Sequence, residues 1–572
     1  MKKIAIITII AIVIIRFFSI NLIPPGISDD EVEYAISAES YSLYNRDISG
    51  SRFPISLFES QTYGKISAIP PILTSVPLKI IKFNVTNLRI LYMFVNLITA
   101  FFVYILTLRL TNSKKTALLG SILFLVNPWS IYLSTYIGDS PFALLFYLSF
   151  IATLLIFNGW KLIIPFLILI MAFFSYHGGK IILLPILLIT LLFKKKVDKK
   201  IKPKEFIIIT ILTTIFLLTY LIISLNLPNS DINARSKEIS LFTPEIISSV
   251  NKNRTQIIQN PLTNIFINKY TESFRQKTKQ YLSAFSPEVI FISGDTRALY
   301  RFEYHGLFYL IDIILISIGL LEMYKKKIYS FLFLISLAVI APIPTAISKI
   351  EISVINRSFL LLPVIIIFSA YGFTFLVNIV PKKIKKLVIP ILICLYITSI
   401  TYFYHFYLFR MPITGQEKYW LSENVICKYL EYKDINKEVK IITPNPRSAL
   451  LRFLILSKNK DIKDAIKNPL PYIEENKEYQ LGSITFTKLC PETISKNTIY
   501  IKSSRLACDI PFKPTFTIID QKDAGVIINI YNSDICQGIS KDVYRRFHYL
   551  KYYDLENLSY EDFCSNWINI PL

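Results

Sequence analysis

The sequence predicts a polytopic α-helical membrane protein with about eleven transmembrane helices and a C-terminal α/β domain outside the membrane. Three observations lead to this fold class. First, 53% of the 572 residues are hydrophobic and 14% are aromatic, which is more apolar than a soluble protein of this size. Second, apolar runs recur through the first 410 residues, many close to the roughly 20 residues that cross a bilayer core. Third, the lysine-rich segments between these runs fall on one side when crossings are counted from an internal N-terminus.

The first apolar run, residues 4–22, could be a cleaved signal peptide or a first helix. Arg16 interrupts it and no small-x-small cleavage site follows, so we expect an uncleaved helix with its N-terminus inside. The other ten runs lie at roughly 88–108, 116–134, 140–157, 161–176, 180–193, 205–226, 306–323, 328–347, 357–379 and 387–409.

Charge sets the expected topology. The dense lysine clusters all fall on the internal side: Lys114–Lys115, Lys194–Lys196 with Lys199, Lys200, Lys202 and Lys204, Lys325–Lys327, and Lys382, Lys383, Lys385 and Lys386. The other side receives 23–87, 129–140, 177–180, 227–305, 348–357 and everything after 410. The net charge of +23 therefore follows the positive-inside bias. We expect no nucleic-acid partner, because no folded reading domain surrounds the basic clusters.

The chain is expected to divide into a membrane domain, 1–410, and a soluble domain, 411–572. In the first external loop, 23–87, we expect short helices at the membrane interface. The long external loop, 227–305, favours helices around 245–258 and 270–284. In the C-terminal domain, strands are expected at 439–443, 483–488, 498–503, 515–520 and 525–531, with a helix near 447–457.

Five of the six cysteines lie in the C-terminal domain: Cys427, Cys490, Cys508, Cys536 and Cys564. No CxxC spacing is present, which argues against a zinc site. Two disulfides with one spare thiol and five unpaired thiols both remain open.

Three adjacent carboxylates, Asp29, Asp30 and Glu31, directly follow the first apolar run. Neighbours on a helix point about 100° apart, so one acid could serve as a base while another binds or orients. The alternative is a solvated helix N-terminus, where the helix dipole favours acids. Asp139, before Ser-Pro, is either a helix cap or a second carboxylate in the same cavity, if its loop folds against 23–65.

Four basic residues, Lys65, His177, Lys180 and Arg357, are expected on or near the external side, against the general bias. A phosphate held at the outer interface would explain them, since Lys and Arg are common phosphate ligands. Snorkelling to lipid headgroups is the alternative for each of them.

An ordered series of motifs resembles a known superfamily. The blocks are PPGISDDE, YSLYNRDISG, FPISLFES, YGK, LRILYMFVN, NPWSIYLS with GD, SYHGGK, LSAFSPEVIFISGD with HGLFYL, PIPTAIS with NRSFLLLP, and YHFYLFRMPI. In this order they resemble bacterial membrane glycosyltransferases of the GT-C superfamily, similar to protein O-mannosyltransferases and the lipid A aminoarabinose transferase. The resemblance covers about residues 1–420 and implies a GT-C-like transmembrane domain with a catalytic first external loop, 23–87. It also implies a polyprenyl-phosphate-linked sugar as donor.

The resemblance assigns roles residue by residue. Asp30 and Glu31 match the Asp-Glu pair of the superfamily, with the Asp as catalytic base, and Asp139 matches a second acidic residue. Asp29 stands where the superfamily usually has a non-acidic residue. Lys65 stands near the expected lipid phosphate, although Ile-Ser follows it here in place of a proline.

The other basic residues carry over in the same way. The SYHGGK block, with His177 and Lys180, matches a Tyr-His-small-small-Lys block, and Arg357 matches an Arg-Ser pair. Residues 411–572 resemble the variable extracytoplasmic domain and carry no assigned motif.

The expected function is transfer of a sugar, with inversion, to a hydroxyl of a glycan, lipid or protein acceptor on the extracytoplasmic face of the cell membrane. One carboxylate base suffices for such a transfer, and Lys65, Lys180 or Arg357 would stabilise the leaving phosphate. No cofactor is required, although a divalent cation at Asp30 and Asp139 is possible. A lipid-linked sugar flippase is the alternative, and would need charges along a midplane path. A membrane-anchored binding protein whose C-terminal domain does the work is a third.

Overall fold

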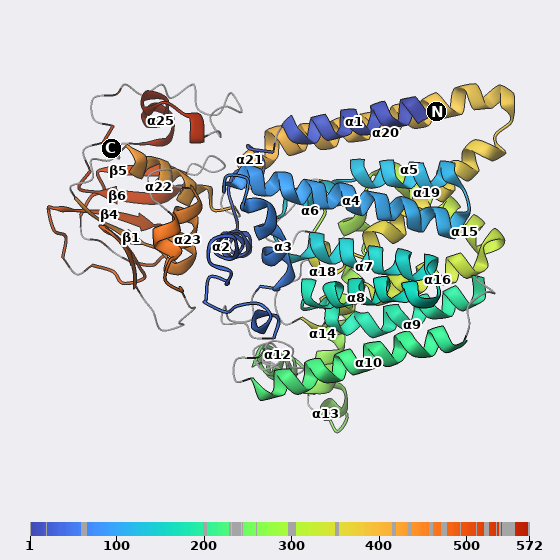
Figure 1. Ribbon diagram of the computed structural model, residues 1–572. Helices are drawn as coiled ribbons and strands as arrows, with labels where there is room; N and C mark the ends of the chain where they lie inside the picture. The colour runs from blue at the N-terminus through green and yellow to red at the C-terminus, as the bar shows by residue number, and fades with distance from the viewer. Residues whose placement is uncertain are drawn as a thin grey trace.

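A computed structural model shows a helical bundle with a β-sheet domain at one end (Figure 1). The residues that the structure describes are 2–18, 20–58, 66–197, 203–227, 230, 242, 244–258, 260–295, 305–348, 354–414, 419–432, 437–456, 462–470, 478–491, 493–508, 510, 512–519, 525–533, 535–536, 539 and 555–569.

A helix lies at each of the eleven apolar runs. These helices are α1 (Lys2–Phe18), α4 (Val85–Thr111), α5 (Lys114–Val126) with α6 (Pro128–Thr135), α7 (Asp139–Ile156), α8 (Ile163–Ser175), α9 (Gly179–Val197), α10 (Pro203–Asn226), α15 (Leu310–Lys326), α16 (Ile328–Ile340), α19 (Leu361–Ile379) and α20 (Lys382–His405). By length and composition, six helical stretches of the described chain can each cross a membrane, and a seventh if α5 and α6, bent by 61°, form one span. The chain is therefore a multi-pass helical membrane protein with six or seven candidate spans.

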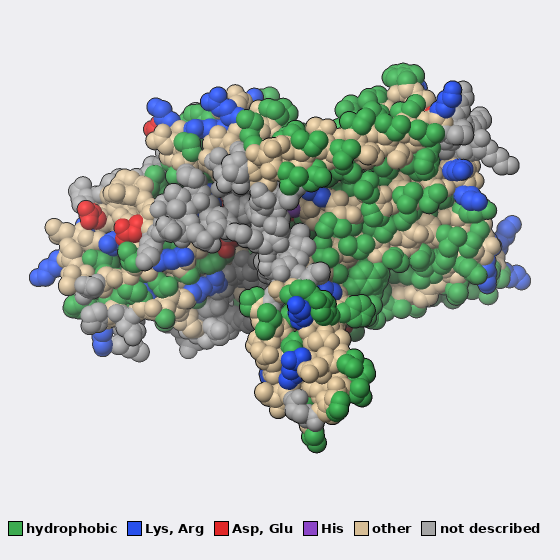
Figure 2. Space-filling view, turned by 90° about the horizontal axis from the view of Figure 1, so that it is seen from below, with side chains coloured by type: hydrophobic (Ala, Val, Ile, Leu, Met, Phe, Trp, Pro, Cys, Tyr) green, Lys and Arg blue, Asp and Glu red, His purple; other side chains and the backbone are tan. Residues whose placement is uncertain are grey.

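The bundle shows the surface expected of a protein in lipid. Exposed Ile, Leu and Phe side chains are numerous along α4, α9 and α10. Figure 2 shows a broad hydrophobic face over the bundle, with Lys and Arg at its end away from the sheet domain and also over the sheet domain. Lysines stand where α5 begins and where α9 and α15 end, so described members of three clusters share that end of the bundle (Figure 1).

The segment 23–87, which the sequence predicts to be an external loop, lies in its described part between the bundle and the sheet domain (Figure 1). It holds α2 (Asp29–Tyr44), a short 3-10 turn (Ile55–Leu57) and α3 (Ile69–Leu78). The long loop holds α12 (Pro244–Thr255), α13 (Thr263–Phe266) and α14 (Lys269–Ser283), so both helices expected there are present. The short helices α17 (Ile343–Ile347) and α18 (Val354–Arg357) precede α19, and α21 (Met411–Thr414) leads into the sheet domain.

The C-terminal domain is built on a mixed six-stranded sheet of order β2-β3-β1-β4-β6-β5. Its strands are β1 (Glu438–Ile442), β2 (Glu478–Leu481), β3 (Ile484–Thr487), β4 (Thr498–Ser503), β5 (Phe516–Ile519) and β6 (Val526–Tyr531). β1 pairs in parallel with β3 and β4, and the remaining pairs are antiparallel. All five expected strands are present. β2 was not anticipated, because EYQL is a short, half-exposed edge strand without an apolar alternation.

Four helices accompany the sheet: α22 (Leu421–Glu431), α23 (Pro446–Leu456), α24 (Ile462–Ile466) and α25 (Tyr560–Trp567). α23 is the helix expected near 447–457, and nearly all of its side chains are buried. Two disulfides are formed, Cys490–Cys508 and Cys536–Cys564, while Cys427 and Cys394 carry free thiols. Of the two possibilities that the sequence left open, the structure has the one with two disulfides.

Candidate active site

The head of α2 is fixed by a capping box. The backbone N–H of Ser28 donates to Glu31 Oε2 at 2.9 Å, and the N–H of Glu31 lies 3.5 Å from Ser28 Oγ. This S-x-x-E arrangement satisfies two amide groups that a helix start leaves open. It also begins α2 at Asp29, so that all three acids sit in the first turn, where the helix dipole favours negative charge.

Asp29 belongs to the contact with the sheet domain. Its carboxylate pairs with Arg452 of α23, whose side chain is fully buried. One helical turn later, Glu33 pairs with Arg447 of the same helix. Asp29 is therefore held by an ion pair across the domain contact.

Glu31 points the other way and is fully buried. Its second oxygen, Oε1, accepts the backbone N–H of Ile137 at 3.2 Å. Burial raises the pKa of Glu31, while the charge of Arg89 and the hydrogen bonds from Ser28 and Ile137 oppose that shift. Glu31 thus ties α2 to the segment that ends, two residues later, at Asp139.

Asp30 is the acid of the three that is exposed to solvent. It shares its face of α2 with Tyr34, one turn on. Burial raises the pKa of Tyr34 well above its ordinary value, and the negative charges of Asp139 and, more weakly, of Asp30 raise it further. Both carboxylates therefore lie near the same tyrosine. Asp139 is half-buried and is the first residue of α7.

Arg357 is the last residue of α18, a short helix that contacts α6 and the start of α7. The Trp129 indole N–H donates to the Ile355 carbonyl at 2.9 Å, and Ser140 Oγ donates to Asn356 Oδ1 at 2.9 Å. Arg357 thus directly follows a residue that is bonded to the neighbour of Asp139.

His177 lies against the loop between α2 and α3. A ring nitrogen of His177 is 3.1 Å from the Ile66 carbonyl oxygen, and the next amide, that of Ser67, donates to the Tyr34 hydroxyl at 2.9 Å. This short path joins His177 to the tyrosine beside Asp30 and Asp139. Lys65, directly before Ile66, lies outside the described residues.

Lys180 sits further along, at the start of α9. Its Nζ donates to the Tyr220 hydroxyl at 2.8 Å and lies 5.1 Å from the ring centre of Phe173. The ammonium therefore rests in an aromatic setting between α8, α9 and α10, which suits a cation.

In the described part of the chain, no group of three or more His, Cys, Asp or Glu residues is placed so that it could hold a metal ion. Asp30 and Asp139 offer two carboxylates, while both oxygens of Glu31 are taken by backbone amides. The donor set for a divalent cation at this site is therefore small.

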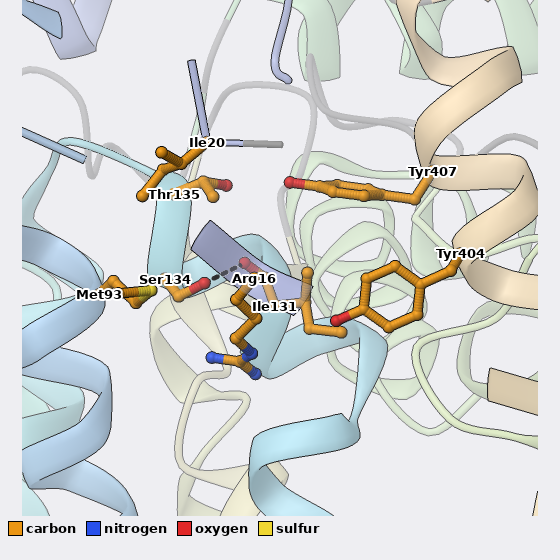
Figure 3. Close-up of a pocket in the computed structure, with 8 residues that line it drawn as sticks. All are labelled: Arg16, Ile20, Met93, Ile131, Ser134, Thr135, Tyr404 and Tyr407. Atoms are coloured by element: carbon orange, nitrogen blue, oxygen red, sulfur yellow. Dashed lines mark hydrogen bonds between the residues drawn. The ribbon is translucent and has the colours of Figure 1, made fainter. Parts of the chain in front are cut away.

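A separate pocket lies between α1, α4, α6 and the end of α20, lined by Arg16, Ile20, Met93, Ile131, Ser134, Thr135, Tyr404 and Tyr407 (Figure 3). Its free space is about 10 Å³, room for about one water molecule. The buried Arg16 guanidinium bonds Asn96 Oδ1 at 2.8 Å and the carbonyl of Leu125, near the end of α5. Arg16 thus supports the bend between α5 and α6. In the sequence, this role is indicated by the charge of Arg16 within the first apolar run.

Comparisons with known proteins place the fold. No model of a known protein family matches the sequence, and no curated protein matches it. Among solved structures, ArnT from Cupriavidus metallidurans bound to undecaprenyl phosphate aligns with a TM-score of 0.50 and 10% identity, over 92% of this chain and 97% of that one. The apo state of ArnT aligns at 0.47 and 9% over the same shares.

The Archaeoglobus fulgidus oligosaccharyltransferase in the apo form aligns at a TM-score of 0.42 and 13% identity, over 78% of this chain. This chain spans 64% of the length of that protein. The structural similarity is thus to GT-C glycosyltransferases, as the sequence motifs suggested, and at such low identity it shows the fold alone.

Proposed function

We propose that this chain is an integral-membrane glycosyltransferase that moves a sugar from a polyprenyl-phosphate-linked donor to an acceptor hydroxyl. The observation that carries the proposal is the sorting of the three acids on α2. Asp29 is paired with Arg452 and Glu31 accepts two amides, while Asp30 is the most exposed of the three and lies, with Asp139, near Tyr34. The likeness to the fold of ArnT, whose structure contains undecaprenyl phosphate, supports the choice of donor class.

In the proposed mechanism Asp30 accepts the proton of the acceptor hydroxyl as that oxygen attacks the anomeric carbon. The bond to the lipid phosphate breaks on the opposite face, so the configuration inverts and the polyprenyl phosphate leaves. Its negative charge needs stabilisation rather than protonation, and Arg357, His177, Lys180 and Lys65 are the proposed donors. Asp139 orients the acceptor or the sugar.

The proposed topology has eleven crossings, a cytoplasmic N-terminus and an extracytoplasmic sheet domain. It rests on the lysines at the start of α5 and at the ends of α9 and α15, which share the bundle end away from that domain (Figure 1). Nucleotide sugars are cytoplasmic, so a transferase that works on the far side needs a donor carried across on lipid.

A flippase would use charges inside the bundle, and Arg16 and Asp312 are two buried examples. Both have protein partners: Arg16 bonds Asn96, and Asp312 accepts from the Ser369 hydroxyl at 2.7 Å. These contacts favour a structural role for the two charges, and transfer over transport.

The test is Asp30→Asn in the purified full-length protein. The assay follows release of undecaprenyl phosphate from synthetic undecaprenyl-phosphate hexoses and pentoses, with a glycan and lipid extract of the envelope as acceptor. Loss of a general base lowers kcat by about 10²- to 10⁴-fold. Asp464→Asn, at an exposed acid on α24, is the matched control and should retain full activity. Full transfer by Asp30→Asn would overturn the base assignment. Sugar-lipid movement across vesicles without transfer by the unaltered protein would favour the flippase.

A further inference from the structure

The acids and the tyrosine at the head of α2 divide between two neighbouring faces. Asp29 and Glu33 are four residues apart and so share one face. Asp30 and Tyr34, also four apart, share the next face, about 100° further round the helix. Any rotation of α2 that moves the first pair therefore moves the second pair equally.

The first face is held by α23 of the sheet domain, and Figure 1 shows the two helices side by side. Arg452, fully buried, pairs with Asp29, bonds Glu423 Oε2 at 2.6 Å and donates to the Ile27 carbonyl at 3.0 Å. Arg452 is fully buried, whereas 40% of the Asp29 side chain is exposed, so loss of Asp29 would leave a buried guanidinium paired with Glu423.

Arg447, five residues earlier on α23, holds the same face one turn further along. It pairs with Glu33 and donates to the Leu470 carbonyl at 3.2 Å. The two arginines pair with α2 at both ends of its first turn. These two contacts fix the rotation of α2 about its own axis as well as its position.

The segments on either side of α2 touch the same domain. The Leu470 N–H donates to the Ile48 carbonyl at 2.8 Å, and Arg46 donates to the Lys467 carbonyl. Before the helix, Gly26 packs so closely on the Tyr419 carbonyl that a side chain would collide with it. The sheet domain therefore contacts the chain before, within and after α2.

We propose that the sheet domain is part of the catalytic apparatus, with Arg452 and Arg447 acting as positioning residues that set the rotation of α2 and so aim Asp30 at the reaction centre. This proposal rests on the proposed function. A catalytic group has to be held within about 0.5 Å and 10–20° of its productive geometry. A displacement of about 1 Å can cost about 100-fold in rate. Asp29 and Glu33 are then positioning carboxylates, and the domain that carries no catalytic motif still governs kcat.

The test uses Arg452→Gln, Arg452→Lys, Asp29→Asn and the double variant Asp29→Asn/Arg452→Gln, with kcat and donor KM measured as above. We expect Arg452→Gln to lower kcat by about 10- to 100-fold and to change KM less than about threefold, because it misplaces the base and leaves donor contacts intact. Arg452→Lys should recover part of kcat. The double variant should be no slower than Arg452→Gln, because partners in one contact are not additive.

Arg505→Gln is the matched control. The Arg505 and Arg452 guanidinium groups lie 4.3 and 4.4 Å from the same Trp420 ring centre, and Arg452 pairs with Asp29. Asp29→Asn leaves the Arg452–Glu423 pair intact, so it tests the contact even if Arg452→Gln fails to fold.

Two results would overturn the positioning role: kcat values of Asp29→Asn and Arg452→Gln within twofold of Arg505→Gln, or a rise in KM at unchanged kcat. If Asp30→Asn is inactive and Asp29→Asn fully active, the positioning proposal fails and the proposed function stands. If Asp30→Asn is fully active, the assignment of Asp30 as base fails and the positioning proposal fails with it. The proposed function itself fails if the unaltered protein transfers no sugar.

Discussion

Glu31 accepts the backbone N–H of Ile137 at 3.2 Å, and this one bond joins the two segments that carry Asp30 and Asp139. Glu31 directly follows Asp30, and Ile137 lies two residues before Asp139. The bond is fully buried, and the other carboxylate oxygen is fixed by Ser28. The separation between the two candidate catalytic acids is thus set by a third acid that does not face solvent.

Glu31→Gln should weaken both the site and the fold. The amide has one acceptor oxygen, so it can satisfy Ser28 or Ile137 but not both, and its NH₂ then faces an amide N–H. A buried polar group left unsatisfied costs about 1–3 kcal/mol. We expect a lower melting temperature in detergent and a kcat about 10-fold lower. Glu561→Gln, in the exposed first turn of α25, is the control. Unchanged melting and activity in Glu31→Gln would refute the bridging role.

The capping box could have been read from the sequence, because Ser28-Asp-Asp-Glu31 has the S-x-x-E spacing that predicts a helix start. That signal would have given Glu31 a structural role before its burial was known. The partner of Asp29 could not be found in this way. Arg452 lies 423 residues further along. Nothing local marks an arginine within an apolar helix as the partner of a particular acid.

The same contrast holds for the fold. Hydrophobic runs and strand alternation are local properties, and they predicted the positions of the bundle helices and of five strands. The edge strand β2 was missed because it lacks an apolar alternation. The helices α22 and α25 were missed because they are short, with 11 and 8 residues, although both are amphipathic. Their place depends on packing against the rest of the sheet domain.

Lys180→Met should weaken binding of the lipid phosphate. Methionine keeps the apolar stem against Phe173 and Tyr220 but removes the charge. A hydrogen bond to a charged group contributes about 1.5–3 kcal/mol, so we expect Kd for undecaprenyl phosphate to rise about 10-fold or more. Lys115→Met, at the exposed start of α5, should leave Kd unchanged. An unchanged Kd with a lower melting temperature for Lys180→Met would mean that Lys180 serves only the aromatic cluster.

Asp47, in the turn after α2, should make stability depend on pH. Burial raises the pKa of Asp47 from 3.8 to about 6, although the amides of Ser51, Ser49 and Gly50 and the charge of Arg46 oppose the shift. Because the folded-state pKa lies above the unfolded one, the stabilising contribution is present below about pH 4 and is lost as pH rises through 6.

The expected loss is up to about 3 kcal/mol, since each pKa unit corresponds to about 1.4 kcal/mol. Asp47→Asn keeps the Oδ1 that accepts from Ser49 and Ser51, so it should gain melting temperature relative to the unaltered protein on going from pH 4 to pH 7. Asp464→Asn should show no such trend. A constant difference between Asp47→Asn and the unaltered protein would contradict the raised pKa.

The oxidation state of the cysteines tests on which side of the membrane the sheet domain lies. Disulfides persist in oxidising compartments, so an extracytoplasmic domain should keep Cys490–Cys508 and Cys536–Cys564 closed in the cell. Alkylation under denaturing conditions without reductant should then label two thiols, Cys394 and Cys427, and all six after reduction. Labelling of six thiols before reduction, in cells quenched with acid, would place the domain in the cytoplasm.

A stability measurement completes this test. Cys536–Cys564 closes a segment of 28 residues and joins the chain after β6 to α25. Closing a loop of that length stabilises a fold by about 3–4 kcal/mol in the chain-entropy description. Cys564→Ser should therefore lower the melting temperature of the sheet domain, and reductant should do the same to the unaltered protein but leave Cys564→Ser less affected. Because the sheet domain holds α2 through Arg452 and Arg447, both Cys564→Ser and reductant should also lower kcat. Loss of the disulfide without loss of kcat would separate the stability of the sheet domain from the placement of Asp30.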